Sequence, residues 1–169
     1  MATPQPQPQR WYLHSGGGAS SRPSDGSLSM VAPTMEPVDS FNCGTATHEL
    51  MPSSEMLSYA SPVFIEPLVV KGTVVAELYA VSSSADTEFT TTLVDVGPDR
   101  RDTVITFVAG SSAAADAPHI AIDFGELAHT FDIGHRMRVD IGASNRGGLA
   151  AQQVFHDAVR PSCVTLPTS

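Results

Sequence analysis

Apolar and polar positions alternate along much of the chain, and this alternation predicts β-strands. The clearest example is the segment RMRVDIGAS, which begins at residue 136. Its apolar positions, which we expect to point into a core, are Met137, Val139 and Ile141. Its charged positions, which we expect to point outward, are Arg136, Arg138 and Asp140. Because the side chains of a strand project alternately to its two faces, this segment fits a strand with one buried face.

Several other segments carry the same kind of signal. In GTVVAELYAV, from Gly72, both alternating sets are largely apolar, which fits a strand covered on both faces. In HIAIDFG the residues that share one face are Ile120, Ile122 and Phe124. The segments FTTTLVDV and DTVITFVAG are rich in β-branched residues, and no segment has helical periodicity beyond one or two turns. The sequence therefore predicts about eight strands in an all-β sandwich or jelly roll.

The start of the chain differs in composition from the rest. Residues 1–10 alternate Pro and Gln, which is typical of an extended, solvated arm or linker. A short strand, WYLH, follows at Trp11, then three glycines and a Ser-rich loop, and residues 31–55 form an irregular connection with three prolines. The length of 169 residues suits one domain, which we expect to span residues 11–169.

The charge balance narrows the choice of partners. With a formal net charge of −9, the chain would be repelled by nucleic acids and anionic membranes. No apolar run approaches the roughly 20 residues of a membrane helix, and no secretory signal is visible, so we expect a cytoplasmic location. Cys43 and Cys163 are far apart and match no metal-binding spacing, which predicts a free, partly buried pair.

Catalytic and metal-binding motifs are missing from the sequence. The GxSxG nucleophile elbow does not occur, and no two of the six histidines have the i, i+2 or i, i+4 spacing of a zinc site. A Ser/His/Asp triad assembled from distant residues stays possible, but serine is too abundant here for proximity to carry weight. Three carboxylates, Asp95, Asp99 and Asp102, bracket the turn VGPDRRD and invite a calcium site. Pro98 and Asp99 favour turn geometry and explain this turn without a bound metal. We therefore expect no metal here and, because the motifs are missing, no catalytic residue and no cofactor in this chain.

The turn SSSADTEF allows two interpretations. Asp86 and Glu88 lie two residues apart, so in an extended segment they would point the same way and could form a weak cation site. The serines before them are residues that cap turns through backbone hydrogen bonds. We favour a structural turn in which Asp86 accepts backbone bonds and Phe89 resumes the apolar face.

Four segments, in order, resemble one protein family. They are WYLHSGGGASS with DGSLS, then PLVVKGTVVAELYAVSSSADTEFTTTLVDVGPD, GHRMRVDIGASN and VFHDAVRPSCVTLP. Together they resemble the C-terminal jelly-roll domain of Xaa-Pro dipeptidyl-peptidases and cocaine-esterase-like serine hydrolases. The resemblance implies a jelly-roll, galactose-binding-like β-sandwich. It also implies an accessory domain that packs on an α/β-hydrolase domain, in the same or a separate chain, and shapes its substrate cleft. The nucleophile lies in that other domain, so we expect this chain to be inactive alone.

Two other functions compete with this interpretation. An autonomous carbohydrate- or ligand-binding jelly-roll module would need exposed aromatic platforms, and the chain has one Trp and three Tyr. A self-sufficient esterase or peptidase would need the missing nucleophile motif. Under the accessory-domain hypothesis we expect an apolar patch on one face, with Trp11 and Tyr12 as candidate interdomain contacts.

Overall fold

In the part of the chain that the structure describes, all regular structure is β-strand. The computed structural model describes residues 7–21, 24–43, 56–84, 87–112, 119–145 and 150–168. The strands are β1 Gln7–His14, β2 Gly26–Ser29, β3 Asp39–Cys43, β4 Leu57–Ala60, β5 Leu68–Ser82, β6 Thr87–Val96, β7 Asp102–Ser112, β8 His119–Phe131, β9 Arg136–Asn145, β10 Ala150–Val154 and β11 Cys163–Thr168. The all-β prediction is confirmed. The strands outnumber the predicted eight because β2, β3, β4 and β10 have only four or five residues, too few to show alternation clearly.

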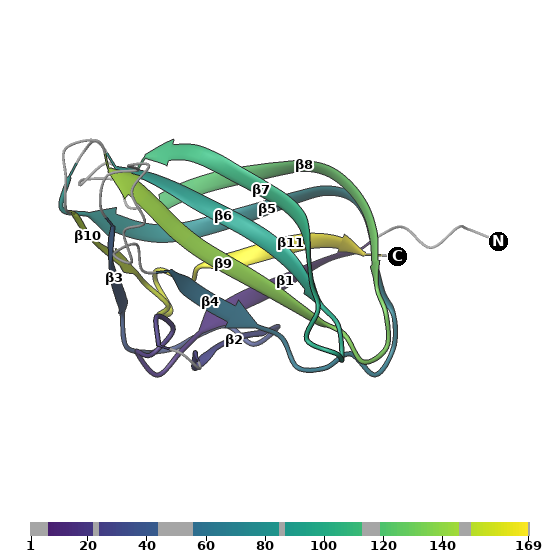
Figure 1. Ribbon diagram of the computed structural model, residues 1–169. Helices are drawn as coiled ribbons and strands as arrows, with labels where there is room; N and C mark the ends of the chain where they lie inside the picture. Colours follow the sequence, from purple (N-terminus) through teal and green to yellow (C-terminus); the bar gives the residue numbers. More distant parts are fainter. Residues whose placement is uncertain are drawn as a thin grey trace.

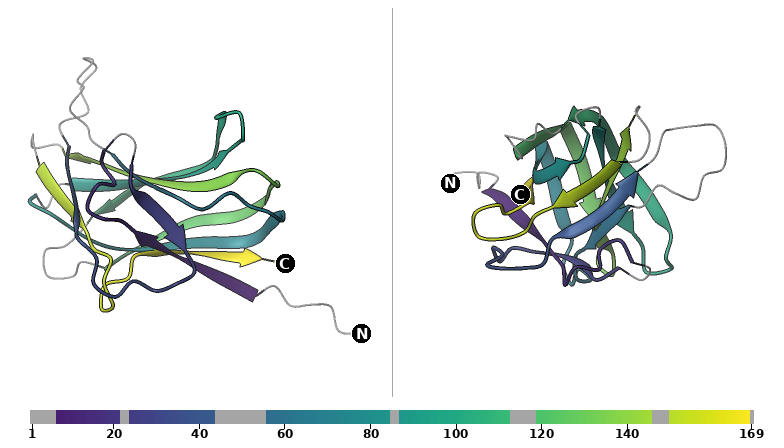
Figure 2. Two further views of the ribbon diagram at one scale, coloured as in Figure 1. Left: turned by 90° about the horizontal axis from the view of Figure 1, so that it is seen from below. Right: turned by 90° about the vertical axis from the view of Figure 1, so that its left-hand side faces the viewer.

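The strands join into one curled, mostly antiparallel sheet. Its order is β3-β10-β5-β11-β1-β2-β4-β9-β6-β7, and β8 pairs with β5 outside this path. Among the described pairs only β2 and β4 run parallel. The layer of β8, β5, β11 and β1 faces the layer of β4, β9, β6 and β7, as Figures 1 and 2 show. The fold is therefore an all-β sandwich, and the jelly-roll path stays a prediction.

The core lies between these layers and follows the alternation of the long strands. In β5 the fully buried positions are Val74, Ala76, Leu78 and Ala80, while the other face is half-buried. The predicted inward residues of β8 and β9 are also buried, and they belong to the same hydrophobic cluster. The faces of β8 and β9 were thus correct from their pattern alone, whereas β5, which we expected to be covered on both faces, is fully buried on only one.

The outward face of β9 differs from the prediction at one position. Asp140 projects outward but is buried, because neighbouring polar side chains cover it. Arg138 holds it in a bidentate pair, with Nε and Nη2 each 2.9 Å from a carboxylate oxygen. Ser58 of β4 donates a further bond of 2.8 Å to the same carboxylate. The charged face of β9 is thus a hydrogen-bonded network and not a freely solvated surface.

The two ends of the described chain pair with each other. β1 begins at Gln7, opposite Thr168, so four residues of the arm predicted for residues 1–10 belong to a strand. Residues 1–6 lie outside the described residues. Likewise, β3 occupies part of the segment predicted to be an irregular connection.

Both cysteines are free and buried, as the sequence predicted. Burial and the neighbouring Glu77 raise the pKa of the Cys163 thiol to about 11. The sulfur lies 3.7 Å from a carboxylate oxygen of Glu77. A thiol in this setting stays protonated at neutral pH and is a poor nucleophile.

Candidate functional site

A buried polar cluster gathers residues from four distant parts of the chain. One oxygen of Asp39, in β3, accepts hydrogen bonds from Ser15 Oγ and Tyr59 OH, each at 2.6 Å. The same oxygen lies 2.8 Å from His156 Nε2. The other oxygen accepts the backbone N–H of Ala19 at 3.2 Å. A Ser, an Asp and a His therefore do meet, which raises the question of a catalytic triad.

The geometry of this cluster is unsuited to nucleophilic catalysis. In a triad the serine hydroxyl bonds to the histidine, and the aspartate holds the opposite ring nitrogen. Here Ser15 and His156 both bond to Asp39, so no base faces the hydroxyl. The His156 side chain is 0% exposed, and its Nδ1 has no partner among the described residues. No substrate could reach these groups without opening the core.

Electrostatics explain how the core tolerates this charge. Burial by itself would raise the pKa of Asp39, but hydrogen bonds from His156, Ser15 and Tyr59 hold that pKa below its ordinary value. Burial, and then the negative charge of Asp39, raise the pKa of Tyr59 well above its ordinary value. Asp39 is thus an ionised carboxylate whose oxygens accept hydrogen bonds from the surrounding groups, and the role of the cluster is structural.

A second polar cluster lies at the end of β6, where the sequence suggested calcium. Asp95 bridges two imidazoles, at 2.7 Å from His129 Nε2 and 2.7 Å from His135 Nδ1. The bond to Asp95 raises the pKa of His135. Asp99 accepts the backbone N–H of Arg101 at 3.2 Å and closes the turn. Asp95 and Asp99 thus bond to protein groups, as expected for a turn that needs no cation to form.

No group of three or more potential ligands suited to a metal ion occurs within the described ranges. The third carboxylate of the calcium hypothesis, Asp102, accepts a bond of 2.9 Å from Arg138. It is thus directed toward β9 and away from Asp95.

The SSSADTEF turn is described in part. Asp86 lies outside the described residues, so its predicted backbone bonds and the weak cation site stay predictions. Glu88 is exposed on β6. Ser82 Oγ accepts the backbone N–H of Ser84 at 3.2 Å and donates to Thr87 Oγ1 at 2.8 Å, which is the capping role expected of these serines. Phe89 is fully buried and does resume the apolar face.

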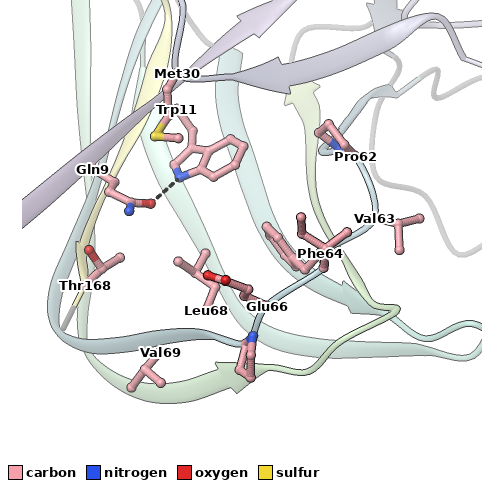
Figure 3. Close-up of a pocket in the computed structure, with 12 residues that line it drawn as sticks. Gln9, Trp11, Met30, Pro62, Val63, Phe64, Glu66, Leu68, Val69 and Thr168 are labelled. Atoms are coloured by element: carbon pink, nitrogen blue, oxygen red, sulfur yellow. Dashed lines mark hydrogen bonds between the residues drawn. The ribbon is translucent and has the colours of Figure 1, made fainter.

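A further functional candidate is a pocket at one end of the sandwich (Figure 3). It has a volume of about 400 Å³, and its walls come from β1, β5, the end of β11 and the β4–β5 connection. Trp11 forms one wall, with its Nε1 donating to Gln9 Oε1 at 3.3 Å. Phe64 faces Trp11 edge-on, with ring centroids 6.0 Å apart. The indole is 7% exposed, so it supports the wall and offers no aromatic platform.

Exposed apolar side chains surround this pocket, and we call them the apolar rim. The rim consists of Met30, Val63, Ile65 and Val69. Their exposed fractions run from 37% to 85%, with Ile65 the highest. The backbone N–H of Gly134, in the β8–β9 turn, donates to Phe64 O at 2.8 Å and ties the β4–β5 connection to that turn.

The two predicted interdomain residues end on opposite faces of β1. Trp11 lines the pocket, whereas Tyr12 is its neighbour along the strand and so projects to the other side. Tyr12 is half-buried there and interacts with Arg10. The structure therefore does not bring the two together, and a contact role for Tyr12 stays a prediction.

Comparison with known proteins places this geometry in a family. A family model described as the X-Pro dipeptidyl-peptidase C-terminal non-catalytic domain matches residues 1–153. The chain belongs to that family. It is also 36% identical over 103 residues to cocaine esterase from Rhodococcus sp. (strain MB1 Bresler), a match that covers 54% of this chain and 18% of the esterase.

Solved structures share the fold of this non-catalytic domain. An aminopeptidase from a marine sediment Thaumarchaeota archaeon superposes with a TM-score of 0.78 and 16% identity, over 96% of this chain and 37% of the aminopeptidase. An alpha-amino acid ester hydrolase gives a TM-score of 0.76 and 16% identity, over 95% of this chain and 36% of the hydrolase. The chain thus spans little more than a third of the length of these proteins.

The apolar rim was not predicted residue by residue. A signal existed in PVFIEP, where apolar residues stand between two prolines and cannot continue a central strand.

Among the described residues the structure contains no helix with the length and apolarity needed to span a membrane.

Proposed function

We propose that this chain is an accessory domain that packs on an α/β-hydrolase domain through the apolar rim and shapes the substrate cleft of that domain. The observation that carries the proposal is the rim around the Trp11 pocket. The parent activity we propose is hydrolysis of an ester, amide or Xaa-Pro peptide bond. This chain would supply shape and stability, and its partner would supply the nucleophile.

The exposure of the rim supports a covered surface. Single exposed apolar residues are ordinary, but a contiguous group around a pocket is typical of an interaction site. Ile65 is 85% exposed and Met30 is 57% exposed. Covering a side chain such as Ile65 would stabilise the assembly by about 1.5–3 kcal/mol.

The pocket suits an anchor from the partner domain. Interface energy concentrates in side chains that fill a well-packed pocket, surrounded by contacts that exclude water. About 400 Å³ of space lies beside the edge-on pair of Trp11 and Phe64. The rim would then exclude water around that anchor.

The arrangement of polar groups in this chain also fits a non-catalytic role. The described Ser–Asp–His cluster is sealed in the core with the wrong connectivity, and the buried Cys163 thiol has a raised pKa. The relatives are hydrolases two to three times as long as the matched region, which leaves room in them for a separate catalytic domain.

The test begins with the reading frame that contains Met1. We expect a GxSxG-bearing α/β-hydrolase segment upstream, and we would produce both that longer protein and the isolated chain. Only the longer protein should turn over p-nitrophenyl acetate or an Ala-Pro chromogenic substrate. Turnover by the isolated chain, blocked by a serine-directed inhibitor, would overturn the accessory role.

Hydrogen exchange then tests the proposed surface. The backbone amides of Val63–Glu66 should exchange more slowly in the longer protein than in the isolated chain. The variant Ile65→Asp should abolish that difference, whereas Val159→Asp, at a position that is 83% exposed and outside the rim, should keep it. Equal exchange in the two wild-type proteins would contradict docking through the rim.

A further inference from the structure

We propose that β7 is a self-association strand that pairs antiparallel with β7 of a second copy of this chain. This surface is separate from the apolar rim and does not depend on the proposed hydrolase partner. Its evidence is a sheet edge with no strand partner among the described pairs, a largely uncharged sequence and a register in which the strand complements itself.

One side of β7 lacks a strand partner. β7 ends the sheet path, where it pairs with β6, and β8 is hydrogen-bonded to β5 instead of β7 among the described pairs. An edge strand presents unpaired N–H and C=O groups, which can bind another strand. The eleven residues of β7 make this edge long.

The sequence of β7 has few of the features that protect such an edge. Natural edge strands carry bulges, lysines, prolines or inward charges that prevent pairing, and of these β7 has only bulges. After Asp102, the stretch TVITFVAGSS has ten residues with no charge and no proline. Its β-branched and aromatic content instead favours pairing.

A bulge places two apolar residues of β7 on the same outer face. Val104 lies opposite Val94, but Phe107 lies opposite Thr92, because the register shifts between Leu93 and Val94. Residues opposite each other in an antiparallel pair project to the same side. Val94 and Thr92 share a face of β6, so Val104 and Phe107 share one as well.

Both of these apolar residues are exposed. Val104 is 61% exposed and Phe107 is 58% exposed, whereas Ile105 and Val108 pack against the core. Burial on the inner face therefore orders the strand, while Val104 and Phe107 stay exposed on its outer face.

These positions define a self-complementary register. A two-fold axis perpendicular to the sheet, between residues 105 and 106, pairs Val104 with Phe107 of the second copy and keeps both on the outer face. Asp102 then lies opposite Ala109, so no like charges meet. Each copy of β7 has its bulge at the same position, so in this register the two bulges lie opposite each other. Without the bulge, Val104 and Phe107 would project to opposite faces and this pairing would fail.

Sedimentation velocity tests the association over a wide concentration range. An interface of this kind is at the small end, below about 1,200 Å² in total, which corresponds to weak dimers. We expect the full chain to pass from monomer to dimer in the micromolar range. Val104→Lys or Phe107→Lys should weaken the dimer at least tenfold, and Val159→Lys, at an exposed position elsewhere, should leave it unchanged. A wild-type chain that stays monomeric, or a dimer unaffected by both β7 variants, would overturn the proposal.

Cross-linking tests the register. The double variant Val104→Cys/Phe107→Cys should form disulfide-linked dimers on mild oxidation, since each new thiol faces its counterpart in the other copy. Each single variant should stay largely unlinked, because identical positions are separated along the pair. The native Cys43 and Cys163 are buried and do not interfere. Equal cross-linking of single and double variants would refute this register.

Discussion

Removal of one hydroxyl from the buried Asp39 cluster should destabilise the protein in a pH-dependent way. In Tyr59→Phe the ring keeps its place in the core, but Asp39 loses the bond of 2.6 Å from the tyrosine hydroxyl. Both side chains are fully buried, so no water replaces the donor at once. A hydrogen bond to a charged group contributes about 1.5–3 kcal/mol, so we expect a loss of about 2 kcal/mol in the free energy of unfolding.

Thermal and urea unfolding at neutral pH measure this loss. For a chain of this size, about 2 kcal/mol corresponds to a fall in Tm of about 4–8 °C. The matched control is Tyr79→Phe. Tyr79 is half-buried against His119, and its hydroxyl has no hydrogen bond to a described residue, so this change should be small.

The pH dependence identifies the cause. Because the folded-state pKa of Asp39 is lowered, its ionised form stabilises the protein above the unfolded-state pKa, and that contribution is lost as the pH falls through the folded-state pKa. The variant should raise the pKa of Asp39, so the difference from wild type should shrink in acid. A loss no larger than in Tyr79→Phe, or one that does not change with pH, would refute the role assigned to Asp39.

Two further predictions concern single ionisable groups. Cys163, with a pKa of about 11, should resist a thiol reagent at pH 8 in the native protein and react fully after denaturation; rapid native labelling would contradict its burial. The pKa of His135, measured by NMR titration, should lie above the ordinary value of 6.5. The charged pair with Asp95 forms below this pKa and is lost as the pH rises through it, so Asp95→Asn should lower the pKa. An unchanged titration in Asp95→Asn would assign the shift to another group.

Long alternating strands were predictable because the apolar or polar character of each residue indicates which face of the strand it occupies. β5, β8 and β9 owe their placement to period-two burial of Val, Leu, Ile and Met, which needs no knowledge of distant residues. β3 was missed for the opposite reason. Its sequence DSFNC begins with a buried aspartate, and that burial is stabilised by Ser15, Tyr59 and His156, which the sequence places far away.

The candidate surface was predictable in kind but not in its residues. The family resemblance implied an apolar patch, and Trp11 does line the pocket. Yet the exposure of Ile65 depends on how the β4–β5 connection leaves the sheet, which is a tertiary property. Trp11 and Tyr12 were both candidate interdomain contacts, and the alternation of β1 places them on opposite faces of the strand.

The pairing of β1 with β11 has a mechanical consequence. Gln7 and Thr168 lie opposite each other at the open end of an antiparallel pair in the middle of the sheet order. Hydrogen bonds in such a pair run perpendicular to the strands, so a force pulling these two residues apart would load the bonds one after another. The sandwich should therefore peel open at low force when stretched between its ends. A force that pulls β1 parallel to its own direction, against a neighbouring strand, would load several hydrogen bonds at once. The protein should resist that force more strongly.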